Sequence, residues 1–600
     1  MTTTSQSTAQ TDAPGRVIPI LEAEFDDFES EAGEFLAGNI EEPVFIGFRL
    51  KQGVYGQRQP DRQMMRIKFP FGAFTADQFD ALADVTEQYM PLRKGHITTR
   101  QNVQFHHFKL TDAGPILRRI AESGLSTREA CGNTVRNVTG DPYAGVRADE
   151  PFDISPYAGA FVRYWVRNPI TQLLPRKFKV AFTGSAQDEA ITGIHDLGFI
   201  PEIRDVDGVP TKGFRMVAGG GLAIMARDAV TLREWVSVDE FLRVSEAVLR
   251  IFNAADELRK NRAKARIKFL VHRVGEAAFR EMVDAELQQP WASERPDTNA
   301  LLYLDDEAAD APTLPAQPAP PAAADRADFE RFVASNARAQ RQSGYCTVEV
   351  KVPQGDLTPE GFRGIAQIMR TFGNGRARTS VNQNIVLRWI PEAQLYPVWT
   401  ALRELGLHHA GAQEITDVVS CPGTDSCKLG ITCSMGLNRA ISQKVQSLEI
   451  VDAATRRMRI NVSGCPNSCG QHHIGSIGFH GAAIKAANSN ERQLPAYHIY
   501  VGGTRANGRI RIGDLLKTRI PAKRAPEVVE RFIAHYQAER LGPNEEFTAF
   551  AERVGTKQLE GLLTDLALPP EFSLEGMDEF IDWERDGLYV LERGEGECAI

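Results

Sequence analysis

The sequence lacks long hydrophobic runs, an export signal and an excess of basic residues. No run reaches about eighteen consecutive apolar residues, so we expect no membrane-spanning helix and no membrane partner. Residues 1–14 lack the basic and apolar segments of a secretory signal, which favours a cytoplasmic location. The formal net charge of -9 argues against a nucleic-acid partner, because such binding needs basic surface.

The sequence also lacks a G-x-G-x-x-G turn between a strand and a helix, so we do not expect it to take hydride from a nicotinamide itself. Cysteine is scarce, and 8 cysteines in 600 residues are too few for a disulfide scaffold. Five of them lie between Cys421 and Cys469. Such a cluster, in a chain without an export signal, indicates metal or redox chemistry.

The sequence contains two copies of one pattern. The segment 65–79 matches 348–362, with Lys, Pro, Gly, Thr and Phe at the same spacing. Three further pairs follow in the same order: 100–103 with 382–385, 177–184 with 457–464, and 217–220 with 500–503. This order predicts two homologous halves of about 280 residues, related by a pseudo-twofold axis.

Each half begins with a small unit of strands and one helix. A strand and a Pro-x-Gly turn precede a predicted helix, at 75–89 and 358–372, and a second predicted strand follows at 97–110 and 378–390. The larger part of each half mixes short strands, Gly-rich turns and helices, which gives an α+β fold class. Between the halves, residues 305–325 are rich in proline and alanine and predict an extended linker.

Four of the clustered cysteines form two closely spaced pairs. Five residues separate Cys421 from Cys427, and three separate Cys465 from Cys469. Four thiolates in loops rich in glycine and proline suit an iron–sulfur cluster. Zinc fits less well, because its ligand pairs are usually about two to four residues apart, and buried free thiols are a third interpretation.

The pair Cys421-x5-Cys427, followed by the segment Gly464–Gln471, resembles the signature of the sirohaem-containing sulfite and nitrite reductases. The resemblance covers residues 64–503 and includes the duplication. It implies a sirohaem whose iron shares the thiolate of Cys469, and a [4Fe–4S] cluster with four ligands: Cys421, Cys427, Cys465 and Cys469. Cys433 lies outside the pattern, and we expect it to be a small buried hydrophobic residue.

The same resemblance implies an internally duplicated fold whose halves each contain a small ferredoxin-like module and a larger α+β module. The predicted parts are an N-terminal extension (1–60), a ferredoxin-like half-domain (61–125), a sirohaem and active-site domain (126–303), an Ala/Pro-rich linker (304–327), a second ferredoxin-like half-domain (328–412), an Fe–S and sirohaem domain (413–545) and a C-terminal tail (546–600). The tail starts amphipathic and ends acidic, and its sequence indicates no chemical role.

Two lysines precede an apolar run in the first half. Lys177 and Lys179 are two residues apart, so on a strand they share one face. Taken alone, such a pair is usually a solvated strand edge. The resemblance implies instead that they are active-site lysines, and that Arg66 and Arg136 complete a cage for a small oxyanion. Arginine would bind the anion as a fixed fork, and lysine could deliver protons.

A second set of polar residues resembles the family's sirohaem-contacting segments. Sirohaem bears eight carboxylates, so its pocket needs cations and amides. The candidates are Arg100, Asn102, Gln104, Asn382, Gln383 and Asn384; without the resemblance they would be read as turns. Residues 219–221 predict either a plain turn or backbone N–H donors for a cofactor carboxylate. The pairs at 106–107 and 472–473 are expected to be structural histidines, because the family's iron takes a thiolate.

Both sulfite and nitrite remain candidate substrates of a six-electron reduction. Lys179 favours sulfite, a dianion near neutral pH, because plant-type nitrite reductases carry Asn at that position, whereas the sequence after Cys465 looks more like the nitrite branch. Some sulfite reductases carry a tyrosine–cysteine crosslink. Cys131 stands at the cysteine position, but Arg49 stands at the tyrosine position, with Tyr55 nearby.

Electrons should come from a partner, which the resemblance implies is an acidic ferredoxin-type donor. The basic run at 259–268 could steer that donor or reach the cofactor carboxylates, or it could be a solvated helix face. An electron-transfer protein without reductase activity is the alternative class of function. The presence of all four candidate cage cations argues against that alternative.

Overall fold

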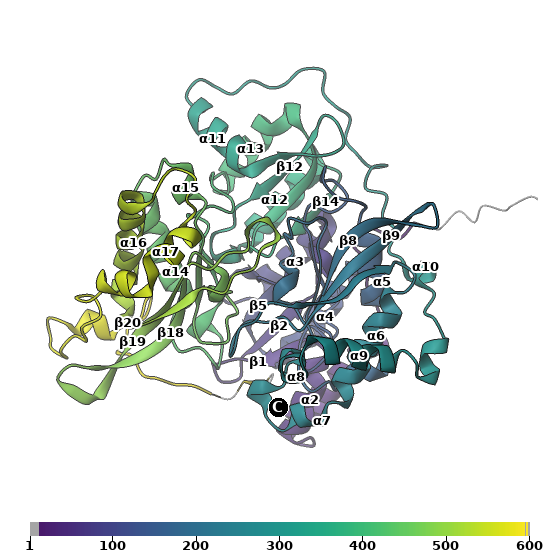
Figure 1. Cartoon of the computed structure of the whole chain (residues 1–600), viewed down its shortest axis with the longest axis horizontal. Coiled ribbons are helices and arrows are strands. Elements are labelled where there is room, and N and C mark those ends of the chain that lie inside the picture. The colour runs from purple at the N-terminus through teal and green to yellow at the C-terminus, as the bar shows by residue number, and fades with distance from the viewer. Residues whose placement is uncertain (1–10, 595, 598–600) are drawn as a thin grey trace, which may run out of the picture.

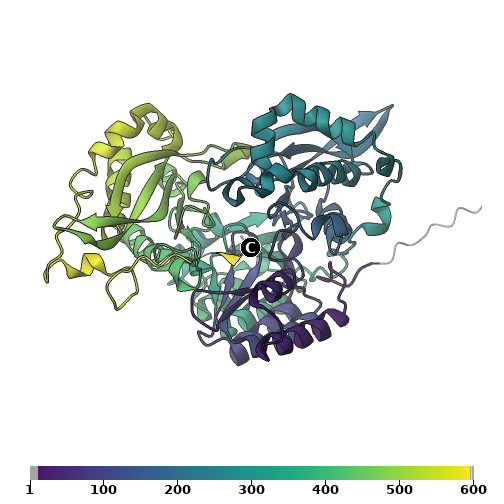
Figure 2. The ribbon, with the colours of Figure 1, turned by 90° about the horizontal axis from the view of Figure 1, so that it is seen from below.

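The computed structural model describes residues 11–594 and 596–597, so Cys598 lies outside the described residues. Three hydrophobic cores organise the chain. One core is shared by the two small modules, and each large module has a core of its own. Figure 2 accordingly shows three lobes, with the large module of the second half in yellow-green at one side and that of the first half in blue and teal at the other.

The predicted duplication is visible element by element (Figure 1). The first small module and the segment before it contain α1 (Ala23–Leu36), α2 (Glu42–Lys51), β1 (Val54–Gly56), β2 (Gln63–Ile67), β3 (Ala73–Thr75), α3 (Ala76–Tyr89), β4 (Gly95–Ile97), β5 (Val103–Phe108) and α4 (Ala113–Glu122). The second contains α11 (Arg326–Asn336), β11 (Ala337–Ala339), β12 (Tyr345–Val350), β13 (Asp356–Leu357), α12 (Pro359–Phe372), β14 (Arg376–Thr379), β15 (Ile385–Pro391) and α13 (Leu395–Glu404).

The two large modules also repeat each other. The first consists of β6 (Thr139–Gly140), α5 (Ser155–Trp165), β7 (Val180–Phe182), β8 (Leu197–Val206), β9 (Val209–Ala218), β10 (Val230–Ser237), α6 (Phe241–Ala254), α7 (Asp256–Arg259), α8 (Ile267–Val274), α9 (Glu276–Glu286) and α10 (Thr298–Leu301). The second consists of β16 (Val419–Ser420), α14 (Ser434–Ser447), α15 (Ala453–Arg456), β17 (Ile460–Ser463), β18 (Ile477–Ala486), β19 (Ser489–Val501), β20 (Asp514–Pro521), α16 (Ala525–Glu539) and α17 (Phe547–Gly561). Their five-stranded sheets run β10-β9-β8-β7-β6 and β16-β17-β18-β19-β20.

The small modules exchange a strand with each other. Strand β13 of the second half completes the sheet β1-β2-β5-β4-β13, and β3 of the first half completes β11-β12-β15-β14-β3. Helices α3 and α12 pack together over these sheets, where Phe79 meets Phe362 edge to face. The exchange joins the halves into one shared core, so neither small module is complete alone.

The two predicted module helices are confirmed, and their caps explain where they begin. Thr75 accepts a hydrogen bond from the backbone N–H of Gln78 at 3.3 Å and forms a capping box with it. Thr358 accepts one from the N–H of Gly361 at 3.2 Å, with Pro359 as the first helical residue. A side-chain acceptor at the N-cap and proline at the first position both favour helix initiation.

The single strands predicted at 97–110 and 378–390 were wrong, because each is a pair of strands joined by a tight turn. Gln101 (φ 58) and Gln383 (φ 69) take the left-handed conformation in these turns. The hydroxyl of Thr98 accepts from the N–H of Asn102 at 3.2 Å, which closes the first turn. In the sequence, apolar residues on both sides of a short polar turn look like one continuous strand, because the positive φ angles of the turn cannot be predicted from the residue types.

Residues 302–325 contain no helix or strand, and the first residues of the predicted linker are held by ion pairs. Glu307 accepts from Arg388 Nε at 2.8 Å and from the Trp389 indole at 2.9 Å. Burial by itself raises the pKa of the Glu307 carboxyl, but Arg388 and Arg378 outweigh it and lower the pKa to about 2. Asp305 and Glu307 therefore fix the start of the linker to the second small module.

We expect Glu307→Gln to lower the free energy of unfolding by about 3 kcal/mol at pH 7, because a carboxyl with a depressed pKa stabilises only while ionised. This contribution is present above the unfolded pKa of 4.5 and is lost as the pH falls towards 2. Urea unfolding of both proteins at pH 7 and pH 3 tests it. If the free energies of unfolding of the two proteins differed by as much at pH 3 as at pH 7, the ion-pair explanation would be contradicted.

Candidate functional site

The four candidate cluster cysteines lie on two loops that leave the same edge of a sheet. Strands β16 and β17 run parallel, so the loops that follow them, with Cys421 and Cys465, start side by side. The N–H of Gly464 donates to the sulfur of Cys421 at 3.2 Å. Burial, with Cys469 as its strongest charged neighbour, raises the pKa of Cys421 to about 12. The thiols therefore lie close enough to influence one another.

Glycine is required where these loops cross. A Cβ atom on Gly464 would lie 2.6 Å from the Cα of Gly423 and 2.7 Å from the carbonyl oxygen of Thr432. That carbonyl belongs to the bend before Cys433, whose thiol is buried and lies 3.4 Å from a carboxylate oxygen of Asp425. The loops can therefore approach only through glycine, and Cys433 is a buried thiol, as expected.

The arrangement disfavours a single bound metal ion. Among residues 11–594 and 596–597, no three His, Cys, Asp or Glu side chains converge to hold one ion. A tetrahedral zinc with Zn–S bonds of about 2.3 Å would need that convergence. A four-iron cubane keeps its thiolates farther apart, so thiols that are neighbours without converging fit a cluster better.

Half-buried cations gather around Lys179. Burial lowers the pKa of Lys179 well below 10.5, and the nearby Arg266, Arg100 and Lys177 lower it further. The strongest opposing charge is the thiolate of Cys469. Arg100 is affected in the same way, since burial and the other arginines lower its pKa to about 9. The structure therefore brings the predicted lysines and Arg100 together near the candidate bridging cysteine.

Arg66 and Arg136, the predicted anion-binding arginines, lie side by side. Both donate to the carbonyl oxygen of Ala130, at 3.0 and 2.9 Å. Arg136 also donates to the hydroxyl of Tyr55 at 3.3 Å, and the Arg66 guanidinium lies 5.5 Å from the centre of the Tyr55 ring. With its amide oxygen turned towards Arg66, Gln104 accepts from Nη2 at 2.6 Å and Nε at 3.0 Å. Each guanidinium is thus held in a fixed orientation.

Sequence reasoning missed Asp196, which organises the lysine side of the site. Its fully buried carboxylate accepts from the backbone N–H of Lys179 at 2.7 Å and from Arg266 Nε at 2.7 Å. In the second half, the hydroxyl of Ser476 accepts from the N–H of Arg459 at 3.0 Å in the same way. Because the second half has arginine and serine at these two positions, the repeat gives no lysine–acid signal that could have revealed Asp196.

His195 also escaped the sequence reasoning. Its Nε2 atom lies 2.9 Å from Arg100 Nη1, and its Nδ1 atom lies 2.8 Å from the carbonyl oxygen of Ile191. Because arginine can only donate, Nε2 accepts and Nδ1 carries the proton. Burial, reinforced by Arg100, lowers the pKa of His195 well below 6.5, so the ring is neutral and holds Arg100 in place.

Several buried polar atoms in this region have no partner within the protein. They are Nε of Arg100, Nη2 of Arg266 and Oδ1 of Asn102. Buried polar groups are nearly always hydrogen-bonded, and unpaired guanidinium donors call for an anionic partner. Carboxylates of a tetrapyrrole such as sirohaem would satisfy both arginines, so the residues present fit that cofactor.

The candidates from the second half are held by the protein framework. Asn382 Oδ1 accepts from Arg459 and Arg505. The side chain of Gln383 bonds backbone groups of residues 97 and 420, at 3.0 Å each. Asn384 donates to Asp417 at 2.7 Å and to Glu349 at 3.1 Å. Their roles as cofactor contacts stay predictions.

Hydrogen bonds show how residues 219–221 and the basic run at 259–268 are used. The N–H groups of residues 219–221 donate to protein carbonyl oxygens at 2.8–3.1 Å, so this segment is a turn and not an anion site. The basic run at 259–268 is divided: Arg266 and Lys268 point inwards, and Lys268 donates to four carbonyl oxygens. Residues 259–264 are exposed.

The residues of the suspected crosslink fall into two environments. Tyr55 and Cys131 belong to one small buried cluster, in which Cys131 Sγ lies 3.8 Å from Arg66 Nη1. Arg49 points elsewhere and pairs with Glu597 at 2.9 Å. The crosslink itself stays a prediction.

A duplicated α+β fold with two facing cysteine loops beside a group of half-buried cations fits the class of iron–sulfur oxidoreductases. The comparisons agree with that class. The description "Nitrite and sulphite reductase 4Fe-4S domain" matches residues 131–291 and 411–567, and "Nitrite/Sulfite reductase ferredoxin-like half domain" matches 55–123 and 338–405. The chain belongs to the nitrite and sulphite reductase family.

Similar proteins carry both activities in their names. Over 483 residues, the chain is 30% identical to a ferredoxin–nitrite reductase of Synechococcus elongatus, covering 79% of this chain and 86% of that protein. It is 28% identical over 498 residues to a sulfite reductase [ferredoxin] of Mycolicibacterium paratuberculosis, covering 83% of each. The structure of the Mycobacterium tuberculosis NirA protein superposes with a TM-score of 0.75 at 25% identity, covering 89% of this chain and 95% of NirA.

Family membership confirms the expected cofactors and fold class. The chain is an oxidoreductase with a [4Fe–4S] cluster and sirohaem, and the zinc and free-thiol interpretations no longer apply. The duplicated α+β fold with ferredoxin-like half-domains is also confirmed. No helix in the described part of the chain is long and apolar enough to cross a membrane. The cytoplasmic location stays a prediction.

Proposed function

We propose that this chain reduces sulfite to sulfide, with six electrons supplied by a ferredoxin-type donor. The observation that supports sulfite is the group of half-buried cations around Lys179, which includes Lys177, Arg100 and Arg266. Attraction to each cation grows with the charge of the anion, so a dianion gains more from this pocket than a monoanion does. Nitrite is the second candidate, favoured by the names of several relatives.

The side chains divide the work between binding and proton delivery. Arg66 and Arg136, both oriented by the carbonyl of Ala130, would clamp the oxyanion as fixed forks. Lys179, whose pKa is lowered by burial and by its cationic neighbours, would give up a proton to an oxygen that leaves as water. Sirohaem and the cluster, when bound, supply the electrons to the substrate one at a time.

Cys421, Cys427, Cys465 and Cys469 would hold the cluster, and Cys469 would be shared with the sirohaem iron. Arg100 and Arg266 are the strongest candidates for binding the tetrapyrrole carboxylates, because each has a buried donor without a partner. The exposed basic residues at 259–264 would attract an acidic donor protein. Long-range steering of this kind weakens with salt.

The substrate preference is tested by comparing kcat/KM for sulfite and nitrite with the same reduced donor. We expect the value for sulfite to be the higher one. A tenfold or greater preference for nitrite would reject sulfite as the primary substrate and leave the rest of the site assignment intact. Weaker turnover at high salt with ferredoxin, but not with a small viologen, would support the docking of an acidic donor.

A further inference from the structure

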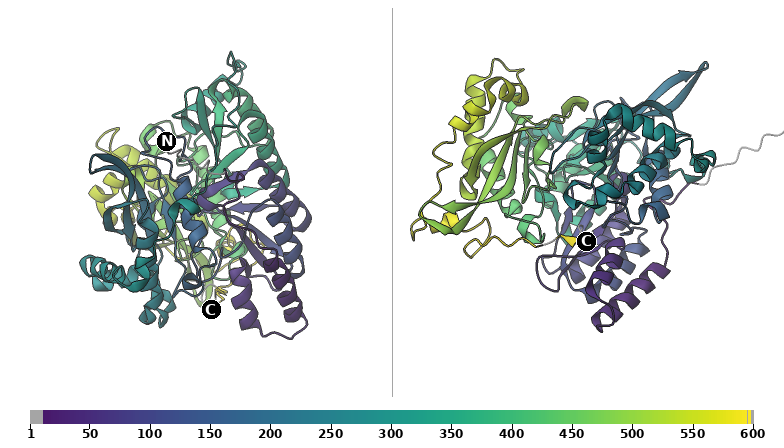
Figure 3. Two further views of the ribbon diagram at one scale, coloured as in Figure 1. Left: turned by 90° about the vertical axis from the view of Figure 1, so that its right-hand side faces the viewer. Right: turned by 60° about the horizontal axis from the view of Figure 1, so that its bottom comes forward.

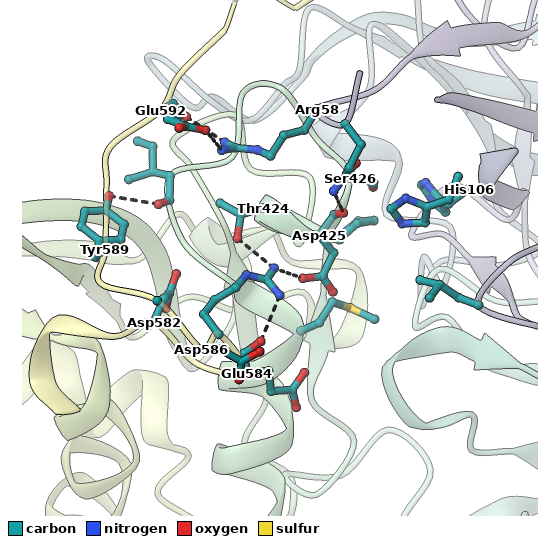
Figure 4. Close-up of a pocket in the computed structure, with 18 of the residues that line it drawn as sticks. Arg58, His106, Thr424, Asp425, Ser426, Asp582, Glu584, Asp586, Tyr589 and Glu592 are labelled. Carbon is teal, nitrogen blue, oxygen red and sulfur yellow. Dashed lines mark hydrogen bonds and ion pairs between the residues drawn. The ribbon is translucent and has the colours of Figure 1, made fainter. Parts of the chain in front are cut away.

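The last part of the chain runs along the cysteine loop. We call residues 581–594 and 596–597 the strap and residues 421–433 the cluster loop. Figure 4 shows the strap crossing this loop, with Tyr589 reaching towards it. Polar contacts join the strap to the loop at several points. Asp582 accepts from the N–H of Cys433 at 2.7 Å, and Arg585 donates to Thr424 at 3.3 Å and to Asp425. Tyr589 donates to the carbonyl of Ile431 at 3.1 Å, and the N–H of Gly594 donates to the carbonyl of Lys428 at 3.0 Å.

Trp583 packs against the core of the second large module, but apolar burial contributes little to holding the outer part of the strap, residues 588–591. Leu588, Val590 and Leu591 are exposed to 38%, 68% and 42%. A segment that leaves such side chains in water gains little from the hydrophobic effect. This outer part of the strap therefore depends on polar contacts of the strap, of which those of Asp582 and Glu597 are the most buried, and one of them reaches the first small module.

That contact is made by Glu597. Its carboxylate accepts from Arg49 Nη2 at 2.9 Å, from Lys428 Nζ at 3.0 Å and from the backbone N–H of Gly56 at 2.9 Å. The side chain is only 3% exposed. Figures 2 and 3 show this end of the chain tucked between the lobes, against the first small module. Glu597 thus joins the cluster loop to strand β1.

Strand β1 also carries a contact to the anion-binding arginines. Gly56 directly follows Tyr55, and Tyr55 contacts both Arg136 and Arg66. Between β1 and β2, Arg58 donates to the carbonyl of Gly430 at 2.7 Å, which is a second link to the cluster loop. Glu597 therefore lies between two supports of the site: the contacts that hold the cluster loop and the contacts that hold the anion-binding arginines.

We propose that Glu597 is a positioning residue that latches the strap and keeps the cluster loop and the anion-binding arginines in one fixed geometry. The proposal does not depend on which oxyanion is reduced. It assigns a role to Arg49, which would neutralise the buried acid and anchor the latch, and to a tail whose sequence alone indicates none.

The latch also has an electrostatic consequence. Lys428 follows Cys427, a proposed cluster ligand, and Glu597 offsets the charges of Lys428 and Arg49. Removing the negative charge of Glu597 leaves these cations uncompensated beside the cluster. Added positive charge favours the reduced, more negative cluster, so its reduction potential should rise.

The test compares Glu597→Gln with Glu592→Gln in the holoenzyme. Glu592 lies on the same strap, but its side chain is 74% exposed. Its carboxylate is 3.7 Å from the guanidinium of Arg58, a long distance for an ion pair, so Glu592 is a matched control. For Glu597→Gln we expect up to about a tenfold change in the reduced-to-oxidised cluster ratio at fixed potential, equal to about 59 mV for one electron. Redox titration followed by EPR measures it, and Glu592→Gln should not shift it.

Limited proteolysis of the strap and the KM for the anion give two further readouts. We expect the Glu597→Gln strap to be cut about tenfold faster and KM to rise more than kcat falls, because the arginines lose a support while the chemistry is unchanged. An unchanged potential together with unchanged proteolysis in Glu597→Gln would overturn the proposal. Neither readout depends on substrate preference, so a wrong choice between sulfite and nitrite would be recognised separately.

Discussion

Lys179→Asn is expected to lower kcat/KM for sulfite by about 100-fold and for nitrite by about tenfold or less, since a hydrogen bond from a charged group is worth about 1.5–3 kcal/mol. The lysine lies in a half-buried group of cations with Lys177, Arg100 and Arg266. A dianion loses more than a monoanion when one of these charges is removed. Steady-state kinetics with a viologen donor measures both values without involving a protein partner.

The matched control for this prediction is Lys517→Asn. Lys517 is an exposed lysine on β20 of the second half, far in the sequence from the pocket, so its removal should leave both values unchanged. Equal losses for sulfite and nitrite in Lys179→Asn would refute the charge argument. In that case, Lys179 would act through proton delivery alone.

Cys469→Ser is expected to abolish turnover, by about three orders of magnitude or more, because it breaks a unit whose parts act together. A serine hydroxyl is a much weaker ligand for iron than a thiolate. The control is Cys433→Ser, at a buried thiol that contacts Asp425 and is no ligand in our proposal. Optical spectra and iron content of both variants, together with turnover, give the comparison.

Two outcomes would contradict the ligand assignment. One is a Cys469→Ser enzyme that keeps its cluster spectrum and its activity. The other is a Cys433→Ser enzyme that loses the cluster but is otherwise folded, as judged by circular dichroism. The second result would point to Cys433 as a ligand in place of one of the four proposed.

The duplication could be predicted because its signals are local. The Thr75 and Thr358 caps and the Pro-x-Gly turns are short patterns that survive in both halves. The cysteine pairs were equally readable, because their spacing is set within single loops. The exchange of β3 and β13 between the sheets was not predicted, since pairing of distant strands leaves no mark in a local pattern.

The inner supports of the site were missed for a similar reason. Asp196 and His195 support Lys179 and Arg100 through hydrogen bonds that form only when the chain folds. A single acid or histidine is common in any sequence, so neither residue stands out there. The roles of Gln383 and Asn384 were also hidden, because an amide that bonds the framework looks the same in sequence as one that binds a cofactor. Only the burial of the amide and the direction of its side chain in the folded protein distinguish a framework contact from a cofactor contact.

The repeat alignment also explains why one half alone carries the cation pocket. Glu349 takes the place of Arg66, and its carboxylate accepts from Tyr143 at 2.6 Å and from Asn384 at 3.1 Å. Asn382 takes the place of Arg100. In the second half, Arg459 and Arg505 instead donate to the amide oxygen of Asn382, so these two arginines are bonded within the protein.

The central claim is that four cysteines hold a [4Fe–4S] cluster and that Cys469 joins it to the sirohaem iron beneath a cation-lined pocket. The most direct test is Mössbauer spectroscopy of the purified, iron-57-enriched holoenzyme. We predict that the cluster irons sense the paramagnetism of the sirohaem iron, which requires a shared ligand. A diamagnetic cluster beside a paramagnetic sirohaem, with no magnetic interaction between them, would contradict the account.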